Sequence, residues 1–134
     1  MTKPVIAVIE DDQQILHMLD DLLRSAGYLV ISNERGADAQ QFVLLTMPDL
    51  IILDLWLADA VHGQMVLELL HREPLTRHIP VIVCSAHTAA LDKLAIPLAL
   101  RGHRTLAKPF QPEVLLAMID EALLQASSPQ ESTN

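Results

Sequence analysis

The segment Asp49–Asp54 places the strongest constraint on how this chain folds. It reads Asp-Leu-Ile-Ile-Leu-Asp, an unbroken run of leucine and isoleucine that is closed by an acid. A strand with one face in water normally alternates apolar and polar residues, and this segment does not. We therefore expect a strand that is buried on both faces, inside a parallel sheet covered by helices.

Other short apolar runs of the chain also end in a polar residue. They are Val5–Ile9 before Glu10, Val81–Cys84 before Ser85, and Thr105–Ala107 before Lys108. In an open parallel sheet the ligand site lies outside the carboxyl ends of the strands. The sequence therefore predicts that Asp54 and these polar residues gather at one edge of one sheet.

Segments with helical periodicity separate the predicted strands. Asp12 is suited to cap a helix that begins at Gln13 and stops at Gly27, because aspartate favours the N-cap and glycine follows helix ends. Pro97 lies inside the fourth predicted helix, where proline costs about 3 kcal/mol, so we expect that helix to be short, kinked or split. The remaining predictions are helices at 37–45, 63–71, 88–100 and from Pro112, and strands at 28–31 and 104–107.

Five alternations of strand and helix predict an α/β fold. We expect a doubly wound (βα)5 parallel five-stranded sheet with right-handed crossovers and the flavodoxin-like strand order 2-1-3-4-5. The first and third strands are neighbours in this order, so Glu10, Asp11 and Asp54 would face each other across a shallow crevice. The chain of 134 residues is expected to form one domain over residues 1–125, followed by a polar, disordered tail over residues 126–134.

The charge and composition of the chain argue against several classes of function. The net charge is −8, whereas binding to nucleic acid or to an anionic membrane needs a basic surface. The N-terminus leads directly into the first predicted strand, so we expect neither a signal peptide nor a spanning helix. The single cysteine, Cys84, is interpreted as a small buried hydrophobe. A cytoplasmic protein is the expectation.

The residues at the predicted edge have a common chemistry. Three carboxylates at one edge repel each other at neutral pH, and such a cluster favours a bound cation. An all-oxygen ligand set suits Mg²⁺, which shares its coordination positions among carboxylates, water and phosphoryl groups. A lysine and a hydroxyl beside an acid and a divalent ion would complete a site for phosphoryl transfer to a carboxylate. Each residue alone is more often a turn or capping residue, so the interpretation depends on their joint occurrence.

Four segments, taken together, match the pattern of a known family. Val8–Asp12, Pro48–Asp54, Val81–Ala86 and Leu106–Phe110 resemble the motifs of the receiver domain of two-component response regulators, in the family's order. The resemblance covers residues 4 to 125, and the set is highly specific although each piece alone is weak. It implies a phosphorelay protein that switches conformation to control a partner. Such a protein catalyses only its own phosphorylation and dephosphorylation and is not an enzyme acting on a metabolite.

The resemblance also implies roles for the acidic residues. Asp54 would accept a phosphoryl group from a histidine kinase or a histidine phosphotransfer protein. Mg²⁺ would be bound by Asp11 and Asp54, with the backbone carbonyl of Trp56 as a third protein ligand. Glu10 would act on the ion largely through water.

The remaining motif positions would bind phosphate and transmit the signal. Ser85 would bind a phosphoryl oxygen and Lys108 would pair with the phosphate. Receivers usually carry an aromatic residue three positions before this lysine, which turns inward on phosphorylation, but Thr105 stands there. The usual proline after the acceptor is Ala58, and Gly63 comes one residue late, so we expect a bulged loop. These departures affect the output more than the chemistry, and we expect an atypical partner.

Trp56 and His87 stand where receivers tune the hydrolysis of the phosphoryl group. A bulky indole at Trp56 would restrict the attacking water and lengthen the lifetime of the phosphorylated form. The alternative is an exposed loop aromatic that packs on a neighbour or a partner. The other histidines are interpreted as surface or partly buried residues: His17, His62, His71, His78 and His103.

Three other functions stay open at this point. A pseudo-receiver would keep the fold as a phosphorylation-independent interaction module, which Thr105 favours and the intact Asp54 and Lys108 oppose. A flavodoxin-like FMN protein would need a phosphate-cradling loop after the first strand, where acids stand instead. A hydrolase with an aspartyl-phosphate intermediate usually carries its acceptor after the first strand, whereas Asp54 follows the third.

The expected partners are the phosphoryl donor and a downstream protein that the sequence does not identify. No DNA-binding segment follows residue 125 in the sequence. We therefore expect either a stand-alone receiver that works through protein contacts or the first domain of a longer chain. Homodimerisation through the last two helices stays open, because no particular residue supports it.

Overall fold

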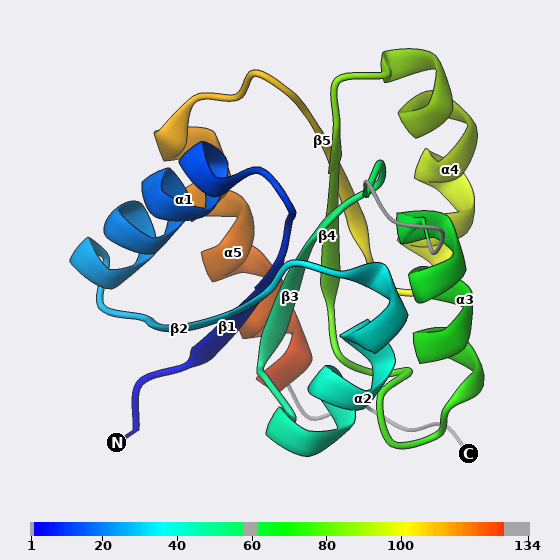
Figure 1. Cartoon of the computed structure of the whole chain (residues 1–134), viewed down its shortest axis with the longest axis horizontal. Helices are drawn as coiled ribbons and strands as arrows, with labels where there is room; N and C mark the ends of the chain where they lie inside the picture. The colour runs from blue at the N-terminus through cyan, green and yellow to red at the C-terminus, as the bar shows by residue number, and fades with distance from the viewer. Residues whose placement is uncertain (1, 58–61, 128–134) are drawn as a thin grey trace.

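The computed structural model describes residues 2–57 and 62–127, which form a parallel sheet between two layers of helices (Figure 1). The order of the five strands is β2-β1-β3-β4-β5, and the predicted α/β fold is confirmed. The strands are β1 Val5–Ile9, β2 Leu29–Asn33, β3 Leu50–Asp54, β4 Val81–Ser85 and β5 Arg104–Ala107. The helices are α1 Gln13–Ser25, α2 Gly36–Thr46, α3 Gly63–Arg72, α4 Thr88–Leu100 and α5 Pro112–Ser127.

The sheet separates two hydrophobic cores. Helices α2, α3 and α4 cover one face, and α1 and α5 cover the other (Figure 1). Along β3, Ile51 and Leu53 belong to the first core, while Leu50 and Ile52 belong to the second. Every residue of β3 is buried, as the unbroken apolar run predicted.

The ends of α1 follow the predicted capping chemistry. Asp12 is the N-cap, and its Oδ1 accepts hydrogen bonds from the N–H groups of Gln14 at 2.9 Å and Ile15 at 3.2 Å. Gly27 follows the helix with a φ of +96°, a left-handed conformation that glycine adopts at little cost. These two residues fix where α1 starts and stops, and so hold the segment after β1 in place.

Strand β2 and helix α5 differ slightly from their predicted bounds. Ser32 and Asn33 continue β2 beyond its apolar residues by pairing with Val8 and Ile9 of β1. Since β2 is an edge strand, polar residues can continue it without being buried. Helix α5 extends to Ser127, so it includes the first two residues of the predicted tail, and residues 128–134 lie outside the described part of the chain.

The prediction of a short or split fourth helix was wrong. Helix α4 runs from Thr88 to Leu100 and passes through Pro97. Pro97 is exposed, so water can reach the carbonyl that loses its amide partner. Leu91 and Leu98 anchor the helix in the core, at 5% and 3% exposed. Burying each leucine contributes about 1.5–3 kcal/mol, which offsets the cost of the proline.

Candidate functional site

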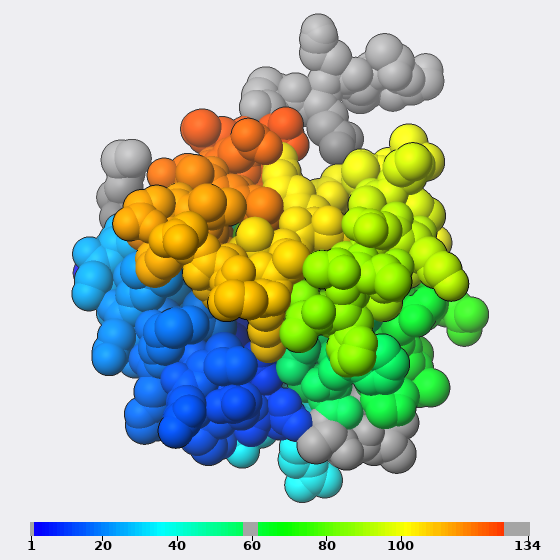
Figure 2. Space-filling view, turned by 90° about the horizontal axis from the view of Figure 1, so that it is seen from above, coloured from blue at the N-terminus to red at the C-terminus, as the bar shows by residue number. Residues whose placement is uncertain are grey.

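The carboxyl ends of β1, β3, β4 and β5 lie together at one edge of the sheet (Figure 1). Asp54 pairs with Cys84 and Ser85 pairs with Ala107, so the strand ends are level. Seen from above in Figure 2, α1, the segment after β5 and the start of α4 come together over this edge. The residues that sequence analysis selected therefore meet here: Glu10 and Asp11 after β1, Asp54, Ser85, and Lys108 after β5.

Glu10, Asp11 and Asp54 form an acidic cluster. Each offers a carboxylate oxygen, and these oxygens lie within 4.8 Å of one another. Glu10 and Asp54 are only 3% and 8% exposed, and Asp11 is half-buried. Carboxylates this close and this buried repel each other unless a cation joins them. The all-oxygen donor set fits a hard divalent ion such as Mg²⁺.

Lys108 reaches into the cluster from the end of β5. Its Nζ lies 2.7 Å from Glu10 Oε1 and 3.7 Å from Asp54 Oδ1. Burial raises the pKa of Glu10 to about 7, although the hydrogen bond from Lys108 opposes the shift. Burial alone would lower the pKa of Lys108, but the hydrogen bond to Glu10 and the charges of Glu10 and Asp54 raise it above 10.5. Lys108 therefore stays charged beside Asp54 at neutral pH.

The backbone around Asp54 is held from two sides. The Trp56 N–H donates to Asp54 Oδ1 at 3.1 Å, and the Gly63 N–H donates to the Leu55 carbonyl at 3.0 Å. A Cβ on Gly63 would lie 2.4 Å from the Asp54 carbonyl oxygen and 2.7 Å from Leu55 Cα. Only a glycine lets the start of α3 pack this closely against the end of β3. Ala58 and the centre of the predicted bulge lie outside the described residues.

Ser85 lies at the end of β4 and is 1% exposed. Its Oγ accepts a hydrogen bond from the His87 N–H at 3.0 Å, and its carbonyl accepts one from the Lys108 N–H at 2.9 Å. The ends of β4 and β5 are thus tied together beside the acidic cluster. Thr105 is half-buried in the middle of β5. Its side chain ends in a methyl and a hydroxyl group, so it lacks the aromatic ring that receivers usually carry at this position.

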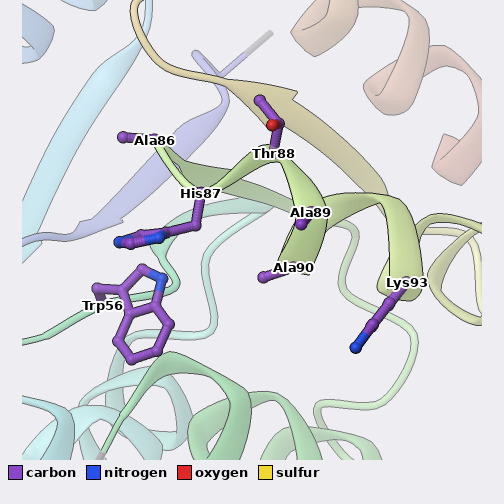
Figure 3. A pocket seen from close by; sticks show the side chains of 7 residues that line it. All are labelled: Trp56, Ala86, His87, Thr88, Ala89, Ala90 and Lys93. Atoms are coloured by element: carbon purple, nitrogen blue, oxygen red, sulfur yellow. The ribbon is translucent and has the colours of Figure 1, made fainter.

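Trp56 and His87 lie in ring contact beside the cluster (Figure 3). Their ring centroids are 5.0 Å apart with an angle of 55° between the planes. Trp56 also meets the ring of His62 edge-on, with centroids 5.9 Å apart and an angle of 64° between the planes. A pocket of about 530 Å³ adjoins Trp56 and His87 and extends to Lys93 of α4. His62 is exposed, as expected, but its contact with Trp56 was not predicted, and its place directly before Gly63 is the one signal that could have pointed to it.

The structure corrects the expectation for His103. It was expected at the surface or partly buried, but it is 7% exposed, and its Nδ1 accepts a hydrogen bond from the Val81 N–H at 3.0 Å. Burial, together with the nearby charge of Arg101, lowers the pKa of His103 to about 4. His103 therefore supports the start of β4 as a neutral hydrogen-bond acceptor, away from the acidic cluster.

Taken together, the residues at this edge can support one kind of chemistry. Asp54 offers a carboxylate as nucleophile, its acidic neighbours complete an oxygen site for a divalent ion, and Lys108 supplies a fixed positive charge. These are the parts that phosphoryl transfer to a carboxylate requires. Among the described residues, no helix is long and apolar enough to cross a membrane.

Comparison with known proteins agrees with this chemistry. A family model described as the response regulator receiver domain matches residues 6–120. The transcriptional regulatory protein GltR of Pseudomonas aeruginosa is 34% identical over 125 residues, which are 93% of this chain and 51% of GltR. Protein Rrf1 of Nitratidesulfovibrio vulgaris is 34% identical over 118 residues, 88% of this chain and 81% of Rrf1. The chain thus spans about half the length of the transcriptional regulators it matches.

Solved structures show the same fold. The crystal structure of a putative response regulator from Chloroflexus aurantiacus superposes with a TM-score of 0.81 at 28% sequence identity. The superposition covers 92% of this chain and 99% of that protein. The strand order and helix layers of the two proteins therefore correspond over almost their whole length.

Proposed function

The chain belongs to the response regulator receiver domain family, and on this basis we propose that it is the phosphoacceptor of a two-component phosphorelay. Asp54 is the acceptor. The observation that carries the proposal is the meeting of Asp54 with Glu10, Asp11 and Lys108 at one edge of the sheet. The fold does not require a buried carboxylate to lie beside a charged lysine and two further acids. Phosphoryl transfer to that carboxylate does require such neighbours.

The proposed reaction is transfer from a phosphohistidine of a kinase or phosphotransfer protein. A carboxylate oxygen of Asp54 attacks the phosphorus atom as the phosphorus–nitrogen bond of the donor breaks. The donor imidazole leaves with the electron pair of that bond, and an acyl phosphate forms on Asp54. Lys108 and the Ser85 hydroxyl bind the oxygens of the phosphoryl group. Hydrolysis of the acyl phosphate returns Asp54 to its carboxylate.

We propose Mg²⁺ as the metal ion of the acidic cluster. Glu10, Asp11, Asp54 and the backbone carbonyl of Trp56 would hold it. When bound, it supplies positive charge that offsets the charge of the phosphoryl oxygens. The carboxylate oxygens of Glu10, Asp11 and Asp54, which lie within 4.8 Å of one another, support this proposal, because a cation at the cluster would relieve their mutual repulsion.

Phosphorylation would act as a two-state switch on a partner protein. The phosphoryl group stabilises a conformer through contacts that exist only in the phosphorylated form. The chain changes only its own covalent state in this cycle and turns over no external metabolite. By analogy with its family, we propose that it works in the cytoplasm, between a histidine-phosphorylated donor and a downstream protein.

The test is the intact mass of the protein after incubation with Mg²⁺ and acetyl phosphate, in parallel with Asp54→Asn. We expect one added phosphoryl group in the wild type, and none in the variant or in the presence of EDTA. No adduct in the wild type, including with a histidine-phosphorylated donor, would favour a pseudo-receiver that binds its partner without phosphorylation.

A further inference from the structure

The indole of Trp56 connects two segments that lie beside the acidic cluster. Trp56 follows β3, and His87 precedes α4. The two rings lie next to each other (Figure 3). Their centroids are 5.0 Å apart and their planes are tilted by 55°. The Trp56–His87 pair, as we call this ring contact, therefore links the loop after the proposed acceptor to the segment that leads into α4.

Backbone hydrogen bonds extend the Trp56–His87 pair to two residues of the site. The Trp56 N–H donates to Asp54 Oδ1 at 3.1 Å, and the His87 N–H donates to Ser85 Oγ at 3.0 Å. A continuous series of contacts thus runs from the acceptor carboxylate to the hydroxyl that would bind phosphate. Asp54 and Ser85 are buried, whereas Trp56 is 49% exposed. The two rings therefore have more room to separate than Asp54 and Ser85 have to move.

His87 also forms the start of α4. It occupies the N-cap position without a side-chain capping bond, and its carbonyl accepts a hydrogen bond from the Leu91 N–H at 3.2 Å. Leu91 is buried in the core under α4. A shift of His87 therefore changes the first turn of α4 directly, with no other element between them.

Strand β5 offers no ring for the same purpose. Thr105 pairs with Val83 of β4 and lines a groove of about 450 Å³ between α4 and α5, together with the small side chains of Ala95, Ala99 and Ala117. A threonine is too short to exchange between an inward and an outward packing position across such a groove. The ring contact that is linked to Asp54 and Ser85 lies instead between Trp56 and His87.

We propose that the Trp56–His87 pair is a latch that holds the start of α4 in its unphosphorylated position. This inference rests on the proposed function. When Asp54 carries a phosphoryl group, the Ser85 side chain rotates about its Cα–Cβ bond, which carries Oγ away from the His87 N–H so that the hydroxyl donates to a phosphoryl oxygen. The His87 N–H then loses its acceptor, His87 shifts away from the indole, and the first turn of α4 is released. Trp56 and His87 are positioning residues in this process, because their rings act through Ser85 and α4.

The test is amide hydrogen exchange of the first turn of α4, with and without phosphorylation by acetyl phosphate and Mg²⁺. Intact mass records the phosphorylated fraction of each sample. Wild type is compared with Trp56→Ala, His87→Ala and His87→Phe, the last of which keeps a ring against the indole. His17→Ala, which changes an exposed histidine of α1, is the matched control.

In wild type we expect phosphorylation to speed exchange in this turn. In Trp56→Ala and His87→Ala, exchange should already be about 2–10-fold faster before phosphorylation, the range that corresponds to one aromatic pair. Phosphorylation should then add little, while His87→Phe and His17→Ala should behave as wild type. Unchanged exchange in the unphosphorylated Trp56→Ala and His87→Ala proteins would overturn the latch, since this comparison needs no phosphoryl group. An equal response to phosphorylation in all variants would also overturn it, whereas failure of wild type to gain mass refutes the proposed function itself.

Discussion

Replacing Gly63 by alanine should damage both the stability of the fold and the proposed reaction. The new Cβ would lie 2.4 Å from the Asp54 carbonyl oxygen, 2.7 Å from Leu55 Cα and 2.9 Å from the Leu55 carbonyl oxygen. All three neighbours are backbone atoms, so no flexible side chain can give way. Relief of the contact needs a shift of about 1 Å at the end of β3. Overpacking in a tight core costs about 1–3 kcal/mol, and we expect the upper end of this range for Gly63→Ala.

The same shift would move the Asp54 carboxylate relative to Lys108 and the acidic cluster. A displacement of about 1 Å can slow a reaction about 100-fold, so we expect phosphorylation of Gly63→Ala to slow by this order. Unfolding in urea, followed by circular dichroism, measures the stability. Intact mass at successive times after addition of acetyl phosphate and Mg²⁺ measures the rate.

Gly27→Ala is the matched control for this experiment. Gly27 has a φ of +96° and nothing within 4 Å of an added Cβ, so the substitution brings only the backbone cost of a left-handed alanine, about 1 kcal/mol. Its rate of phosphorylation should equal that of the wild type, because Gly27 lies at the far end of α1. Wild-type stability and rate in Gly63→Ala, or an equal slowing in Gly27→Ala, would refute the reasoning.

Three further predictions concern single residues. His103 has a folded pKa of about 4 against an ordinary 6.5, so the unfolded chain is protonated at His103 before the folded protein is, and the contribution of His103 to stability falls as the pH drops from 6.5 to 4. This loss should reach about 3 kcal/mol, while the raised pKa of Glu10 changes stability in the opposite direction over the same range. Urea unfolding should therefore show the loss as a difference in pH dependence between wild type and His103→Gln, and His17→Gln should match wild type. Glu10, with a pKa of about 7 in the folded protein, should release a proton when Mg²⁺ binds at pH 6, which calorimetry in buffers of different ionisation enthalpy can measure. Glu10→Gln should abolish this release, and its persistence would assign the proton to another group. Trp56→Ala should shorten the lifetime of the phosphorylated form several-fold, as followed by mass after removal of the donor, and an unchanged lifetime would exclude shielding by the indole.

The arrangement of the sheet and the composition of the crevice were predictable from local sequence. Glu10, Asp54, Ser85 and Lys108 each end an apolar run, and parallel strands leave no other place for their ends than a common edge. Burial of β3 on both faces was equally clear, because Leu50 to Leu53 contain no polar residue. Capping of α1 by Asp12 depends only on neighbouring backbone groups, which explains why this prediction succeeded.

Other features depend on contacts that local sequence does not encode. The cost of Pro97 depends on which side of α4 faces water, and this becomes known only when the helix is packed. The extension of β2 through Asn33 depends on its pairing with β1. His103 is buried because the register of β4 and β5 brings it to the Val81 N–H. The contact of Trp56 with His62 and His87 joins different loops, and no periodicity links these residues.

The most direct test of the central claim is to locate the phosphoryl group on the chain. Borohydride reduces an acyl phosphate of aspartate to the alcohol, so phosphorylated protein treated in this way should contain homoserine at the modified position. Peptide mass spectrometry after reduction should find homoserine at position 54 and unmodified aspartate at Asp11 and Asp12. Homoserine at another acidic residue, or a phosphoryl group on a histidine, would contradict the assignment of Asp54 as the acceptor.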